Sequence, residues 1–322
     1  MELAAQSHFP DASGATFTKK IHHSVPPALD PRVQPLPGRF VVAITGASQG
    51  LGRATAEVFA RAGAAGLILS ARTLAGLEET RRICEEAHSA SKKPADNTNL
   101  KITLVVGSVG TGADAKRPAD AVRDEHEGRI DMLINNAGVV STHESAWGPL
   151  DQIRPDQLDV PMQTNYIGRF LTMQALMPAL LASPSGGTVV NVTSICSHFT
   201  AAGHGALGFN ISALASNRLT EMAAEVYRTD GTEGGGGGKG PVFYSVHPGT
   251  IFTNPPVGAP KELYKLCTDD ADLCGAVCLW LGRNRPGWLN GRYISATWDL
   301  EELQERKAEI VEGDKLKSRM VL

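Results

Sequence analysis

The sequence predicts an α/β protein in which a single doubly wound parallel sheet carries helices on both faces. From residue 40 onward, apolar runs of strand length alternate with amphipathic stretches of helix length. This alternation is typical of βαβ units, whose helices cover both faces of a parallel sheet. The first strand also leads into a glycine-rich turn and then a helix, a frequent opening of such a unit. The chain has 322 residues, 42% of them hydrophobic, which is enough for one large domain with a sizeable core.

The pattern predicts seven strands and six longer helices. The strands are expected at Phe40–Ile44, Leu67–Ser70, Ile102–Val106, Met132–Ile134, Thr188–Val192, Phe243–Val246 and Arg292–Ile294. The helices are expected at about 50–63, 74–90, 113–127, 160–182, 209–229 and 269–282.

Three segments are expected along the chain. Residues 1–37 are rich in proline and polar residues and are predicted to form an N-terminal arm wrapped on the domain. Residues 38–300 form the predicted domain, and residues 301–322 form a charged tail with a helical pattern. Within the domain, Gly231–Gly240 contains a run of consecutive glycines and is predicted to be a flexible loop.

Composition excludes several classes of partner. The formal net charge of -3 gives no reason to expect nucleic acid or an anionic membrane. No apolar stretch approaches the roughly 20 residues of a membrane span. The five cysteines include no Cys-x-x-Cys pair and have no histidine ligands nearby, so no metal site is expected. We expect a reduced, cytoplasmic protein that acts on a small molecule.

The glycine turn is the clearest candidate for a binding site. The strand around Val42 runs into Gly46-Ala47-Ser48-Gln49-Gly50-Leu51-Gly52, and a helix follows. Glycines at these positions allow a tight turn and a close approach of the backbone to a pyrophosphate. The N-terminus of the following helix directs free N–H groups and the positive end of its dipole at the same anion.

This Thr-Gly-x-x-x-Gly-x-Gly pattern resembles that of the short-chain dehydrogenase/reductase family. Four further segments match the family in order and spacing, over about residues 38–300: Asn135-Asn136-Ala137-Gly138, Asn165, Asn191-Val192-Thr193-Ser194, and His247-Pro248-Gly249-Thr250-Ile251-Phe252-Thr253. The arm and the tail, with Trp298-Asp299-Leu300, look like versions found in fungal natural-product pathways.

The resemblance implies a Rossmann-type fold and a nicotinamide cofactor. The residues that it assigns to cofactor binding are Gly46, Ser48, Gln49, Gly50, Leu51, Gly52, Arg72, Ser108, Asn136, Ala137, Gly138, Pro248, Gly249, Ile251 and Thr253.

The end of the second strand favours NADP(H) over NAD(H). Family members that use NAD usually place an acid where this chain has Ala71, and Arg72 follows it. An arginine can pair with the 2′-phosphate of NADP, whereas an acid would repel it. The alternative for Arg72 is a solvated surface arginine. Ser108 departs from the family, which often has an Asp there in contact with adenine.

The catalytic site is only half present. The resemblance implies roles for Ser194, which orients the substrate carbonyl, and for Asn165, which supports a water relay. The family's catalytic Tyr and Lys, however, fall on Phe209 and Ala213. Between Ser194 and Tyr227 the sequence has neither a Tyr nor a Lys, so no shifted alignment supplies them.

A replacement proton donor would have to come from the loop before Phe209. Cys196, His198 and His204 are the candidates there, and a histidine near its ordinary pKa of about 6.5 could serve. Each of the three can equally be a packing or surface residue.

Three functions remain open at this point. The first is a non-standard NADPH-dependent reductase of an iminium, enone or carbonyl. The second is a redox-neutral cyclase or isomerase, including cycloaddition, that uses the shaped pocket for orientation. The third is a non-catalytic partner subunit. The resemblance also implies a homodimer or homotetramer formed through the helices at about 160–182 and 209–229.

Overall fold

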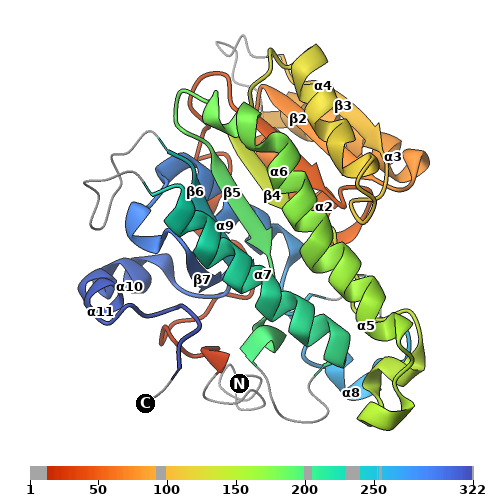
Figure 1. Ribbon diagram of the computed structural model, residues 1–322. Helices are drawn as coiled ribbons and strands as arrows, with labels where there is room; N and C mark the ends of the chain where they lie inside the picture. Colours follow the sequence, from red (N-terminus) through yellow and green to blue (C-terminus); the bar gives the residue numbers. More distant parts are fainter. Residues whose placement is uncertain are drawn as a thin grey trace.

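Seven parallel strands form one sheet in a computed structural model that describes residues 13–91, 99–198, 205–228, 240–251, 253 and 256–320. The strand order is β3-β2-β1-β4-β5-β6-β7 (Figure 1), so the chain winds outward from β1 in two directions. The strands are β1 Val41–Thr45, β2 Gly66–Ala71, β3 Lys101–Val106, β4 Met132–Asn135, β5 Thr188–Val192, β6 Val242–His247 and β7 Arg292–Ser295. The predicted doubly wound parallel sheet is confirmed, with each strand within one or two residues of its expected bounds.

Helices cover both faces of the sheet. On one face lie α2 Gly50–Arg61, α3 Leu74–Ser91 and α9 Ala271–Asn284, which pack Phe59, Leu77 and Leu279 into a core with Val42 and Ile44. On the other face lie α4 Arg117–Glu125, α6 Gly168–Leu181 and α7 Leu207–Val226 (Figure 1). Their core side chains include Val122, Leu176 and Leu180. Because both faces are covered, the central strands are buried throughout.

The long helix predicted at 160–182 is present, but it is not regular α-helix throughout. The structure has α5 Asp156–Pro161, a π-helical turn over Met162–Ile167, and then α6. The wider turn contains Asn165, whose side chain bonds both the amide and the carbonyl of Val139 at 2.8 Å. Single π turns often mark functional sites because they redirect a side chain out of the regular helical register.

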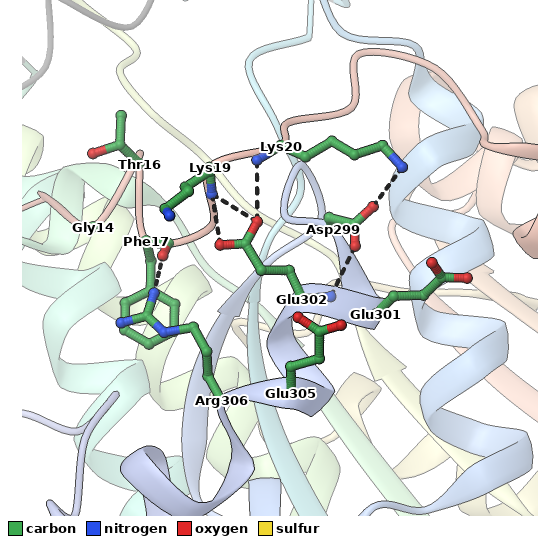
Figure 2. Close-up of a pocket in the computed structure, with 10 residues that line it drawn as sticks. All are labelled: Gly14, Thr16, Phe17, Lys19, Lys20, Asp299, Glu301, Glu302, Glu305 and Arg306. Carbon is green, nitrogen blue, oxygen red and sulfur yellow. Dashed lines mark hydrogen bonds and ion pairs between the residues drawn. The ribbon is translucent and has the colours of Figure 1, made fainter.

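The N-terminal arm is attached to the tail. Ile21 forms a β-bridge with Trp298, and the Glu302 carboxylate accepts from the amides of Lys19 (2.8 Å) and Lys20 (3.2 Å). Glu302 belongs to α10 Leu300–Glu305, which α11 Lys307–Glu312 follows. Figure 2 shows the groove between the two segments, where Lys20 pairs with Asp299 and Glu302 accepts from the backbone of the arm. We therefore assign this groove to attachment of the arm and not to a ligand.

A buried polar network fixes α7 on the sheet. Thr220 Oγ1 accepts from Asn191 Nδ2 on β5 (2.9 Å) and from Ser245 Oγ on β6 (2.8 Å), and it donates to Ser216 O. Asn191 Oδ1 in turn accepts from Asn135 Nδ2 on β4 at 2.9 Å. The hydroxyl of Thr220 thus joins the helix to two strands, and it sets the depth at which α7 lies over their carboxyl ends.

Replacing Thr220 by valine tests this network. The Thr220→Val protein keeps the shape of the side chain but leaves donors on Asn191 and Ser245 unpaired. We expect it to lose about 1–3 kcal/mol of unfolding free energy, measured by thermal denaturation. Met222→Ala, an exposed position on the same helix, is the control and should change stability by less than about 0.5 kcal/mol. Equal stability of the two variants would contradict the role of Thr220.

Candidate cofactor and catalytic site

The glycine turn is as tight as the sequence predicts. Gly46 and Gly50 have positive φ angles of 68° and 54°, a region that side chains disfavour. A Cβ placed on Gly52 would lie 2.3 Å from Gly46 O and 2.5 Å from Asn136 Nδ2. No side chain fits there, so α2 begins directly against the end of β1. Ser48, Gln49 and Leu51 complete the turn, and Ser48 O accepts from Arg53 Nη2 at 2.5 Å.

The segment after β4 locks onto this turn. Thr45 Oγ1 accepts from the amides of Asn136 and Ala137, both at 3.0 Å. Asn136 Nδ2 donates to Thr45 O at 3.0 Å and to Gly46 O at 3.3 Å. A Cβ on Gly46 would lie 2.8 Å from Ala137 Cα, so the two segments are in direct contact. The structure therefore brings together the two motifs that the sequence assigns to one cofactor.

The other end of the predicted site has an exposed cation. Arg72 directly follows β2 and is exposed. Ser108 follows β3, and its amide donates to Asp114 Oδ2 at 3.0 Å. That hydrogen bond and one from Thr111 lower the pKa of Asp114. Asp114 was not predicted as a site residue from the sequence. Its position six residues after Ser108 was the one feature that could have indicated this contact.

The Pro248-Gly249 turn is held in place by Asp269, which lies outside the predicted cofactor motif. Thr250 N donates to Asp269 Oδ2 at 2.5 Å, and a Cβ on Gly249 would lie 2.7 Å from the same oxygen. Burial raises the pKa of Asp269, whose other oxygen bonds His23 Nδ1 of the arm at 2.5 Å. No local pattern in the sequence signals that the arm reaches this turn.

The segment that follows Gly249 also approaches the N-terminus of α2. A Cβ on Gly50 would lie 3.1 Å from Thr253 Cγ2. A pocket of about 540 Å³ lies here, lined by Gly50, Ile251, Thr253 and residues 267–271. The structure thus places three of the predicted cofactor residues around one hollow. The segment beyond it contacts the loop after β4, since Val257 O accepts from Ser141 Oγ at 2.7 Å.

The predicted catalytic residues gather around the first turns of α7. Asn165 Nδ2 donates to Ser212 Oγ at 2.9 Å, one residue from buried Ala213. Ala213 O accepts from Thr193 Oγ1 at 3.2 Å, beside Ser194. Ser194 is buried and its Oγ accepts from Cys196 N at 3.1 Å. Phe209 is half-buried, and its carbonyl accepts from Ser212 Oγ. His204 lies outside the described residues.

The loop after Ser194 offers poor acids at neutral pH. Burial raises the pKa of Cys196 and lowers that of His198. The neighbouring His247 accepts from Ile195 N at 3.2 Å, and burial lowers its pKa to about 3. His198 also packs edge-on against Tyr293, with ring centroids 4.6 Å apart. These groups are therefore neutral and packed, which favours the packing interpretation of His198 and Cys196.

Two other classes of site find no support in the described ranges. They contain no cluster of three or more His, Cys, Asp or Glu side chains that could hold a metal ion. Within them, every helix is also too short or too polar to span a lipid bilayer.

Comparison with known proteins identifies the family. The short chain dehydrogenase family model matches residues 40–230, and the chain therefore belongs to that family. It is 36% identical to the short chain dehydrogenase mpl6 of Monascus purpureus over 317 residues, which cover 98% of this chain and 99% of the relative. It is 32% identical to the short chain dehydrogenase pgmD of Aspergillus terreus, with 96% of this chain and 95% of the relative covered.

Solved structures share the fold. Levodione reductase superposes with a TM-score of 0.65 at 24% identity, covering 80% of this chain and 96% of that one. A Shigella flexneri protein assigned to the short chain dehydrogenases, solved with NADP, superposes with a TM-score of 0.64 at 23% identity over 82% of this chain and 99% of that one. The family and its relatives support an oxidoreductase.

A methyl group at Gly52 tests the close approach at the turn. Gly52→Ala forces two backbone segments apart, and we expect a loss of about 1–3 kcal/mol of unfolding free energy in urea denaturation. Gly112→Ala is the matched control, because a Cβ there meets nothing within 4 Å. If Gly52→Ala is as stable as the control, the turn is looser than described.

Proposed function

We propose that the protein is a non-standard NADP(H)-dependent reductase of a small natural-product-type substrate. The observation that carries this proposal is the turn at Gly46–Gly52, where Gly46 and Gly52 leave no room for a side chain against Ala137 and Asn136. Such a close backbone approach serves a pyrophosphate at the N-terminus of a helix. Family membership and the fungal relatives support the reductase class and the natural-product type of substrate.

Arg72 supports NADP(H) as the cofactor. It is exposed at the end of β2, beside Ala71, where no acid opposes a phosphate. A guanidinium can bind a 2′-phosphate through paired hydrogen bonds. Among the proteins with this fold, one from Escherichia coli is described as a complex with NADPH (23% identity, TM-score 0.65).

The chain's own residues define what reaction is accessible. The bound cofactor supplies hydride to an electrophilic carbon. We expect Ser194 to orient a substrate oxygen, and Asn165 connects α7 to the segment after β4. Phe209 has no proton to give and Ala213 has no charge. A ketone therefore lacks the acid assistance that typically contributes about 10²–10⁴-fold, whereas an enone or an iminium depends less on it.

The apolar Phe209 favours a second candidate, a redox-neutral cyclase or isomerase on the same scaffold. A phenyl wall can orient a folded substrate without proton transfer. Product formation without NADPH oxidation would support this candidate and contradict the reductase. A protein that binds a nicotinamide cofactor but turns over neither class would instead fit a non-catalytic partner subunit.

Arg72→Ala tests the cofactor assignment. We expect NADPH binding to weaken by at least about 10-fold, while NADH binding is unchanged, because only NADPH carries the 2′-phosphate. Calorimetric titration of both cofactors measures the effect. Arg82→Ala is the control, since Arg82 is exposed on α3 and paired with Glu79 and Glu86. Equal affinity of the wild type for NADPH and NADH would contradict the assignment.

A further inference from the structure

One arginine next to the candidate site is buried with part of its guanidinium unpaired among the described residues. Arg169 lies on α6, one helical turn beyond Asn165, and is only 6% exposed. Its Nε and Nη1 atoms are buried without any hydrogen-bond partner among the described residues. Burial lowers its pKa to about 10, so the guanidinium still carries its charge at neutral pH.

Such a group is costly in a folded protein. A buried charge without a counter-ion or hydrogen bonds destabilises the native state, and buried arginines are therefore normally paired. Arg292 on β7 has the same exposed fraction as Arg169, and its guanidinium is paired in the usual way. It donates to Trp288 O at 3.0 Å and pairs with Asp314 at 3.1 Å. An unpaired buried arginine calls for an explanation, and a bound ligand that accepts its hydrogen bonds is one.

The guanidinium of Arg169 faces the wall of the cofactor site. Helical side chains lean toward the N-terminus of their helix, which here directs Arg169 back toward Asn165. A Cβ placed on Gly138 would lie 3.9 Å from Arg169 Nη2 and 3.5 Å from Asn165 Oδ1. Gly138 directly follows Ala137, which contacts the glycine turn. Gly138 has no side chain that could stand between the guanidinium and this wall.

Helix α7 offers no buried cation of its own in this region. Ala213 is uncharged, and the first basic residue of the helix, Arg218, is exposed and paired with Glu221 at 2.6 Å. Arg169 thus carries a buried positive charge, one helical turn from Asn165, that no described acid neutralises.

Building on the proposed function, we propose that Arg169 is a cofactor-binding residue. Its guanidinium donates hydrogen bonds to hydroxyl oxygens of the bound nicotinamide dinucleotide. The ligand then satisfies the donors that the protein leaves unpaired. A fixed positive charge here also repels a cationic iminium, so an enone is favoured among the substrates of the proposed function.

The test compares two buried arginines. Arg169→Met removes the charge with a side chain of similar length, and Arg169→Lys keeps the charge. Arg292→Met is the matched control, a paired arginine at the same exposure but away from the site. NADPH and NADH are titrated calorimetrically into each folded protein, and melting temperatures are measured without cofactor.

We expect Arg169→Met to weaken NADPH and NADH equally, by about 10- to 100-fold, because both cofactors carry the same hydroxyls. Arg169→Lys should recover part of this loss. Without cofactor, Arg169→Met should melt no lower than the wild type, since it removes an unpaired buried charge. Arg292→Met should melt lower and bind both cofactors normally.

Unchanged affinity of Arg169→Met for both cofactors would overturn the proposal, and a lowered melting temperature with that result would make Arg169 a structural residue. A wild type that binds neither cofactor would overturn the proposed function and this role together. The two failures are therefore distinguishable.

Discussion

The structure of the site depends on the contact between the carboxyl ends of β1 and β4. Thr45 Oγ1 accepts hydrogen bonds from the amides of the two residues that follow β4. Gly52 leaves no room for a side chain against Gly46 and Asn136. This contact holds the N-terminus of α2 at the crevice where the strand order reverses between β1 and β4. Ligands of open α/β sheets bind at such a point. The rest of the site is arranged around it, with Pro248-Gly249 on one side and Arg72 on the other.

Side-chain hydrogen bonds hold the elements around the proposed catalytic residues in place. Asn165 bonds Ser212, and Thr220 fixes α7 to the sheet. An unpaired buried charge at position 169 destabilises the fold, and the proposed contact of Arg169 with a bound cofactor would offset this cost. Together with the apolar Phe209, this arrangement supports our proposal of an altered reaction over that of a non-catalytic subunit.

The sequence predicts the local features well and the long-range ones poorly. Each strand is found within one or two residues of its expected position, because apolar runs of this length are decided locally. The glycine turn is predictable for the same reason. The bond from His23 to Asp269 joins segments 246 residues apart, and no local pattern signals it. Arg169 appears in the sequence as one basic residue on an amphipathic helix, and only packing shows that it is buried.

In the proposed reaction, the site delivers hydride without a tyrosine as proton donor. We would follow, by mass spectrometry of the product, the transfer of deuterium to 2-cyclohexenone and related enones from NADPH that carries deuterium at both C4 positions. The proposed reductase places one deuterium in each reduced product and forms one equivalent of oxidised cofactor. A rearranged or cyclised product without deuterium, formed while NADPH is unconsumed, would contradict it.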